Sequence, residues 1–183
     1  MNRIACCALI VLASCLVSAS AAPVHTQCGP DVSFSFDDAV WQIARPAAPE
    51  AGKKSYELLL RLKANPGEQA RFWSVQLGAE ERAKMEAMSP AQLLGHMANM
   101  LSRRNTGPAI TATESAGPVH FAYVESQGPS GRPFSLYVGA VRKGDLLLYV
   151  MHMFEPHRSE GTALDARSMK ARFVALVSTI AVR

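Results

Sequence analysis

Hydrophobic and polar residues alternate with a period of two over several parts of the chain, which is typical of β-strands. The alternation is clear in residues 32–36 (VSFSF) and in residues 56–64 (YELLLRLKA). The turn signal NPGE at residues 65–68 then precedes a returning strand, on which three apolar residues share one face: Trp73, Val75 and Leu77. We therefore predict an antiparallel hairpin in this part of the chain.

The period changes to that of a helix after residue 79. Residues 79–88 favour helix by propensity, and Ser89-Pro90 fits an N-cap followed by proline in the first helical position. Apolar residues then recur at helical spacing: Leu93, Leu94, Met97, Met100 and Leu101. The opposite side carries Gln92, His96, Asn99 and Arg103. We predict an amphipathic helix, whose four polar residues are a candidate surface for a partner protein.

Four further strand signals cover residues 109–115, 119–126, 134–141 and 146–154. A last helix is expected to begin near Thr162, with an apolar stripe made of Met169, Phe173, Leu176, Val177 and Ile180. This order predicts an α+β fold, in which an antiparallel sheet of about six to seven strands has helices packed on it.

Proline and glycine mark the segments that we expect to lie outside the regular elements. Residues 23–31 are predicted to be a short tether, and residues 45–54 (RPAAPEAGKK) a loop. The remaining chain, residues 32–183, is then a single domain, which agrees with a length of 183 residues and a hydrophobic content of 49%.

Residues 146–154 have an unusual pattern, because both faces of this strand are apolar. One face carries Leu146, Leu148, Val150, His152 and Phe154. The other carries Leu147, Tyr149, Met151 and Met153. A strand of this kind is covered on both sides, so we predict packed layers above and below the sheet. His152 is then a core histidine held by a hydrogen bond.

His152, Glu155 and His157 resemble a zinc-binding cluster, but their spacing matches neither H-E-x-x-H nor H-x-x-E-H. Those motifs need a helix to bring ligands four residues apart onto one face, and Pro156 disfavours a helix here. Met151 and Met153 point away from His152 on a strand. We therefore expect no metal and no other cofactor, and the three residues stay as an alternative metal site.

The N-terminus resembles a secretory signal peptide, which we place at residues 1–22. A positive start, an apolar run from residue 4 to residue 17 and small residues up to Ala22 follow in the expected order. The run LASC ending at Cys15 also resembles the lipobox of bacterial lipoproteins. We therefore predict a periplasmic protein, with a membrane-anchored lipoprotein lipidated on Cys15 as the alternative. No later stretch is long and apolar enough to predict a membrane span.

Removal of the signal peptide leaves Cys28 as the single cysteine, so no intramolecular disulfide is expected. It also leaves 18 of the 19 basic residues against 15 acidic ones. The basic residues occur as scattered pairs without interleaved aromatic residues, which argues against a nucleic-acid partner.

The chain from residue 72 to residue 183 resembles the PsbP-like and DcrB-like α/β/α sandwich domains of exported bacterial and thylakoid-lumen proteins. The similarity lies in the order of the segments FWSVQL, SPAQLLGHMANML, AGP, YVGAVRKGDLLLYVMHMF and KARFVALVSTI, with VSFSF as an opening strand. The resemblance implies a PsbP-like sandwich and a small accessory or binding domain that is not an enzyme. It implies no catalytic residue.

We expect a non-enzymatic accessory or binding protein that acts in the periplasm through an unidentified protein partner. An immunity factor or an accessory factor of a secretion system would be of this kind. The expectation rests on a small exported domain without a disulfide and without a catalytic motif. The alternatives are a small-molecule or lipid carrier with an apolar cleft between sheet and helix, and a metallohydrolase that uses His152, Glu155 and His157.

Overall fold

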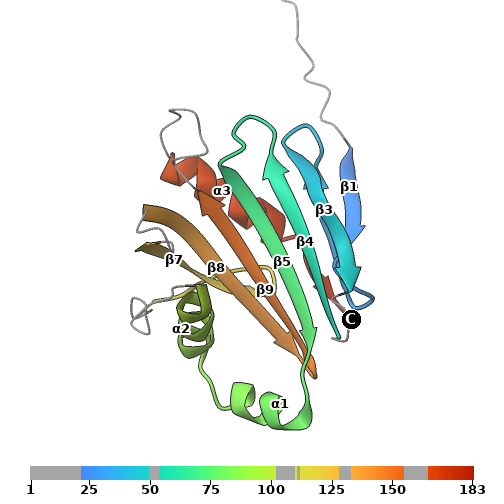
Figure 1. Cartoon of the computed structure of the whole chain (residues 1–183), viewed down its shortest axis with the longest axis vertical. Coiled ribbons are helices and arrows are strands. Elements are labelled where there is room, and N and C mark those ends of the chain that lie inside the picture. Colours follow the sequence, from blue (N-terminus) through green and yellow to red (C-terminus); the bar gives the residue numbers. More distant parts are fainter. Residues whose placement is uncertain (1–21, 50–53, 102–109, 111, 128–132, 155–164) are drawn as a thin grey trace, which may run out of the picture.

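The computed structural model describes residues 22–49, 54–101, 110, 112–127, 133–154 and 165–183. Within them the chain forms a seven-stranded antiparallel sheet, a three-stranded sheet and three helices (Figure 1). The predicted α+β class, with helices packed on an antiparallel sheet, is confirmed. None of the helices in these ranges is long and apolar enough to cross a membrane.

The large sheet has the strand order β3-β4-β5-β9-β8-β7-β6. Its strands are β3 (Trp41–Pro49), β4 (Ser55–Leu62), β5 (Glu68–Gln76), β6 (Glu114–Ala116), β7 (Val119–Gln127), β8 (Pro133–Lys143) and β9 (Leu146–Phe154). The small sheet has the order β1-β2-β10, formed by β1 (Pro23–Gln27), β2 (Val32–Asp37) and β10 (Ala181–Val182). The helices are α1 (Ala79–Glu86), α2 (Pro90–Leu101) and α3 (Ala166–Val177).

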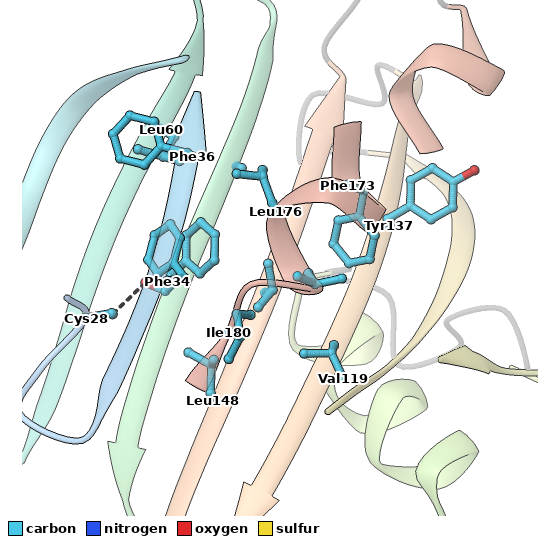
Figure 2. Close-up of a cluster of buried hydrophobic side chains, with 14 of the residues drawn as sticks. Cys28, Phe34, Phe36, Leu60, Val119, Tyr137, Leu148, Phe173, Leu176 and Ile180 are labelled. Carbon is cyan, nitrogen blue, oxygen red and sulfur yellow. Dashed lines mark hydrogen bonds between the residues drawn. The ribbon is translucent and has the colours of Figure 1, made fainter. Parts of the chain in front are cut away.

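One face of the large sheet packs against the small sheet and α3. Phe34 of β2 stacks on Phe72 of β5 with ring centroids 3.9 Å apart, and Phe173 of α3 stacks on Tyr137 of β8 at 5.4 Å (Figure 2). Leu148 and Val150 of β9 belong to this core and are fully buried. We call this side of the large sheet the inner face.

The opposite side, which we call the outer face, is covered by α2 over β7 and β8. Leu94 and Met97 of α2 are buried against Val138 of β8 and Met151 of β9. Helix α2 begins with reciprocal bonds, because Ser89 Oγ accepts from the Gln92 backbone N–H and Gln92 Oε1 accepts from the Ser89 backbone N–H. The layers over both faces of β9 confirm the two-sided strand that the sequence predicted.

The predicted tether at residues 23–31 is wrong. Residues Pro23–Gln27 form β1, which pairs antiparallel with β2. Their side chains alternate between exposed and half-buried, so β1 is held by backbone hydrogen bonds rather than by an apolar stripe that a sequence pattern would reveal. Cys28, the predicted single cysteine of the mature chain, is fully buried, and its thiol donates weakly to the backbone oxygens of Tyr56 and Phe72.

The predicted loop at residues 45–54 is also partly wrong, because β3 continues to Pro49. Two register shifts against β4, between Ile43 and Arg45 and between Arg45 and Ala48, accommodate the prolines. β3 lies at the edge of the sheet, where one side of the strand has no neighbour to pair with and prolines are best tolerated.

Two other boundaries differ from the predictions. The strand expected at residues 109–115 is limited to Glu114–Ala116 in the described chain. Asp165 is itself the N-cap of α3, since its carboxylate accepts from the backbone N–H groups of Arg167 and Ser168. The predicted apolar stripe of α3 is buried, and Ile180 follows in the turn that leads to β10.

Candidate functional site

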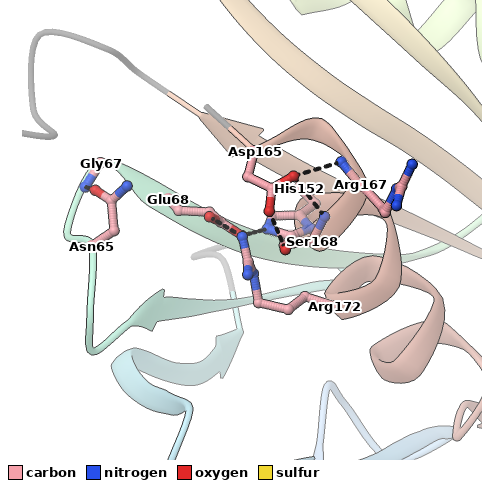
Figure 3. Close-up of polar contacts among 8 residues, drawn as sticks. All are labelled: Asn65, Gly67, Glu68, His152, Asp165, Arg167, Ser168 and Arg172. Atoms are coloured by element: carbon pink, nitrogen blue, oxygen red, sulfur yellow. Dashed lines mark hydrogen bonds and ion pairs between the residues drawn. The ribbon is translucent and has the colours of Figure 1, made fainter. Parts of the chain in front are cut away.

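His152 lies on β9 with no exposed surface and is held by Glu68 of β5. Its Nε2 lies 2.7 Å from Glu68 Oε1. Arg172 of α3 donates to both oxygens of the same carboxylate, through Nε at 2.6 Å and Nη2 at 2.7 Å (Figure 3). We call these three residues the buried triad. The predicted core histidine with a hydrogen-bonded partner is confirmed.

The charges of the buried triad balance when His152 is neutral. Burial lowers the pKa of His152, and the nearby Glu68 carboxylate opposes this only in part. Burial alone would raise the pKa of Glu68, but the hydrogen bonds from His152 and Arg172 outweigh it and leave that pKa below its usual value. The Glu68 carboxylate therefore neutralises Arg172, and a neutral His152 donates its Nε2–H to Glu68.

The metal hypothesis stays a prediction, and in this arrangement Nε2 of His152 is bonded to Glu68, which leaves only Nδ1 of this residue as a candidate ligand atom. Nδ1 has no partner, and the ring is enclosed by Trp41 and Phe173 at centroid distances of 5.3 and 6.1 Å. The ranges that the structure describes hold no group of three metal-binding side chains. Glu155 and His157 lie outside those ranges, as does the lipidation candidate Cys15.

Glu68 was missed as a site residue because its sequence context is a turn. The signal that identifies it is alternation, since Glu68, Ala70 and Phe72 occupy every second position and all face inward. The inward-facing side of β5 is therefore continuous with the inner face, and its first member is an acid with an exposed fraction of only 2%.

The described residues of the predicted partner surface on α2 are exposed, as the helical pattern predicts. Gln92, His96 and Asn99 are exposed, whereas Leu93 and Leu94 are buried beneath them. Arg103 lies outside the described residues. Gln92 caps the start of its own helix.

A groove of about 300 Å³ opens between α2 and the outer face of the sheet. Its lining comes from one helix and three strands: Met97 and Met100 from α2, Glu57 from β4, Arg71 and Trp73 from β5, and Tyr149 and Met151 from β9. In Figure 1, α2 lies at the β7–β8 side of the sheet, away from β3 and β4. The groove therefore lies at the edge of the area of the sheet that α2 covers.

The strand register brings these side chains together. Trp73 lies directly opposite Glu57 on one side and Tyr149 on the other, and Arg71 lies opposite Met151. Directly opposed residues point to the same face of a sheet. The Trp73 and Tyr149 rings are 5.9 Å apart between centroids, so they form a continuous aromatic floor.

Two hydrogen-bond donors in this floor have no partner among the described residues. They are the indole Nε1 of Trp73 and the hydroxyl of Tyr149, and both atoms are buried. Burial raises the pKa of Tyr149 to about 12, so its hydroxyl keeps its proton at neutral pH. Leaving such a group without a partner costs about 1–3 kcal/mol.

The charged part of the lining is an ion pair. Arg71 Nε lies 3.1 Å from Glu57 Oε1 but without the alignment of a hydrogen bond, and Arg45 Nη1 lies 3.3 Å from Glu57 Oε2. The Glu57 carboxylate is thus shared by two guanidinium groups.

A second hollow, of about 280 Å³, lies beside α3 and includes Trp41 and Arg172. Three of its polar side chains already have partners. Arg172 binds Glu68, Asp37 accepts from the backbone of Ala39, and the Thr179 hydroxyl bonds to the Ser35 backbone. The groove under α2 is therefore the stronger binding site, since its donors are unpaired.

Comparison with known proteins identifies no family for this chain. No family model matches it, and no curated protein matches it. A crystal structure from Bacteroides thetaiotaomicron is similar over 90% of this chain, with 10% sequence identity and a TM-score of 0.47. This chain spans 49% of that protein's length. The resemblance to PsbP-like and DcrB-like domains stays a prediction from the sequence.

Proposed function

We propose that this protein is a non-enzymatic binding protein whose ligand is a small molecule held in the groove between α2 and the sheet. The observation that carries the proposal is the pair of unpartnered donors on Trp73 and Tyr149 in a lining that also holds three methionines and the Arg71–Glu57 ion pair. Small-molecule sites characteristically combine an apolar wall with a few placed polar groups.

The size and composition of the groove support this proposal. Its volume of about 300 Å³ is at the lower end of the range for small-molecule pockets. Three of its seven lining residues are methionines, whose flexible side chains adapt to the shape of a ligand. The lining acid, Glu57, is within ion-pair distance of two arginines, an arrangement that favours a role in charge pairing over one in catalysis.

The hypothesis of a protein partner stays a prediction, with Gln92, His96 and Asn99 as its exposed surface. Export to the periplasm also stays a prediction, because it depends on residues 1–22. A small-molecule carrier is compatible with the same exported location.

A titration with N-phenyl-1-naphthylamine, a neutral probe whose fluorescence rises in apolar sites, tests the proposal. We expect saturable binding to the purified protein. Met100→Asp puts a charge at the exposed rim of the groove and should weaken binding by about ten-fold, which corresponds to about 1.4 kcal/mol. Asn99→Asp adds the same charge at the neighbouring exposed residue outside the lining, and should change affinity less than about two-fold.

Absence of saturable binding to the unmodified protein, both of this probe and of its anionic analogue 1-anilinonaphthalene-8-sulfonate, would contradict the proposal. Equal weakening by Met100→Asp and Asn99→Asp would also contradict it, because the probe would then be bound elsewhere.

A further inference from the structure

We infer that the ligand of the groove is an amphiphilic anion, meaning an apolar chain or ring that carries one carboxylate or similar acid group. This inference rests on the proposed function and specifies its ligand class. Three independent features of the outer face support it: the hydrogen-bonding character of the lining, the charge around it and the position of its apolar wall.

Three of the four polar side chains in the lining can donate hydrogen bonds. Trp73 Nε1–H can only donate, Arg71 can only donate, and the Tyr149 hydroxyl is protonated and has no acceptor near it. Glu57 is the acid in the lining, and its carboxylate lies within ion-pair distance of two arginines, although its Oε1 has no aligned hydrogen bond. Donors therefore outnumber acceptors in the lining, which favours a ligand that brings acceptors.

The charge on the open part of the outer face is positive. Arg45, Arg61 and Arg71 come from three neighbouring strands, against the single carboxylate of Glu57. Three guanidinium groups and one carboxylate leave a formal excess of two positive charges among these residues. Such an excess beside a partly enclosed groove attracts anions.

Arg61 lies beside the groove rather than in its lining, on the strand next to Arg71. It lies opposite Gln69 while Arg71 lies opposite Leu59, so Arg61 and Arg71 are diagonal neighbours on adjacent strands. The Nε of Arg61 is buried and has no partner in the described chain. A carboxylate bound between these arginines would receive charge-assisted hydrogen bonds from planar guanidinium groups, the geometry that arginine provides best.

The apolar wall lies on the other side of the groove. Met97 and Met100 of α2 form it, and Met151 lies between this wall and Arg71. A ligand would therefore place its acid group toward β4 and its apolar part under α2. A neutral hydrocarbon would leave the donors unpaired, and a cation would meet the positive charge.

Two probes with the same ring system test the ligand class. N-Phenyl-1-naphthylamine is neutral, and 1-anilinonaphthalene-8-sulfonate adds one sulfonate to the same skeleton. We expect the anionic probe to bind at least about ten-fold more tightly at low ionic strength, as charge-assisted hydrogen bonds predict. Arg61→Gln and Arg71→Gln, measured separately, should each reduce this preference to below about three-fold.

Arg167→Gln provides the matched control. Arg167 is exposed on α3, which packs against the inner face, so its loss changes the net charge equally without touching the groove. This variant should keep the preference for the anionic probe. Arg61→Gln leaves the Glu57 ion pairs intact, so a folding defect in Arg71→Gln does not prevent the test.

The outcomes separate this inference from the proposed function. Equal affinities for the two probes, or tighter binding of the neutral one, would overturn the anion assignment while the groove still binds small molecules. A preference that survives both arginine substitutions would also overturn it. Binding of neither probe would overturn the proposed function together with this inference.

Discussion

Glu68 illustrates at the scale of single residues how a buried charge is tolerated. The Glu68 side chain is only 3% exposed, and its carboxylate accepts hydrogen bonds from Arg172 and His152. A buried ion needs such partners, because water no longer solvates it. The buried triad therefore connects β5, β9 and α3 at one point of the inner face.

Replacement of Glu68 by glutamine should destabilise the protein substantially. Arg172 would keep its charge without a counter-ion, and we expect the free energy of unfolding to fall by about 2–4 kcal/mol. Urea denaturation followed by circular dichroism measures the change. Glu114→Gln is the control, because the Lys170–Glu114 pair has the same 2.6 Å separation but a Glu114 side chain that is 58% exposed. A large effect of Glu114→Gln, or none of Glu68→Gln, would contradict this assignment.

Tyr149→Phe is expected to have the opposite effect on stability. Its hydroxyl is buried without a partner, so its removal should leave the free energy of unfolding unchanged or raise it by up to about 1 kcal/mol. Ser74→Ala is the comparison, since the Ser74 hydroxyl donates to the Cys28 carbonyl at 2.7 Å. Ser74→Ala should lower the free energy of unfolding by about 1 kcal/mol. Clear destabilisation by Tyr149→Phe would mean that its hydroxyl has a partner.

At the scale of elements, α3 packs closely against the inner face at Gly139 of β8. A Cβ atom at Gly139 would lie 2.8 Å from a methyl group of Val119 and 3.0 Å from the ring of Phe173. The absence of a side chain therefore lets α3 approach the sheet. Gly95 of α2 differs, because a Cβ atom there would have nothing within 4 Å.

The same substitution at these two glycines should consequently change the free energy of unfolding in opposite directions. Gly139→Ala overpacks the interface below α3 and should lower the free energy of unfolding by about 1–3 kcal/mol. Gly95→Ala improves the helix propensity of α2 without a clash. It should therefore raise the free energy of unfolding by up to about 1 kcal/mol. Thermal denaturation of both variants measures the effect, and equal signs would contradict the packing described for α3.

For the whole molecule, the buried triad makes stability depend on pH. Burial lowers the pKa of His152 in the folded state below its ordinary value of 6.5. As the pH falls through 6.5, the unfolded chain binds a proton at this histidine and the folded chain does not. Stability is therefore fully present above this pH and decreases below it.

We expect the free energy of unfolding to fall by up to about 1.4 kcal/mol per pH unit below pH 6.5 from His152 alone. The lowered pKa of Glu68 adds a further loss below its ordinary value of 4.5, with the same sign. Denaturation between pH 7.5 and 5.0 measures the slope, and NMR of the imidazole nitrogens follows His152 directly. Protonation of His152 at or above pH 6.5 in the folded protein would contradict this prediction.

The local patterns of this sequence determined the elements whose burial repeats with a regular period. The two-sided strand at Leu146–Phe154 and the apolar stripe of α3 were both predicted, because a period of two or of 3.6 places neighbouring residues on known faces. β1 and the later part of β3 were not, since backbone pairing with a neighbour stabilises them and their own side chains are mostly exposed.

The sites depended on contacts between elements that are far apart in sequence. Glu68 and His152 are 84 residues apart and meet through the pairing of β5 with β9. The same pairing places Trp73 beside Tyr149, two residues that the sequence identified only as apolar members of strands. Periodicity fixes the face on which a side chain lies, whereas strand order, register and the extent of the cover by α2 decide its neighbours. The sequence by itself therefore determined the layers, and the tertiary structure decided which donors were left unpaired in a groove.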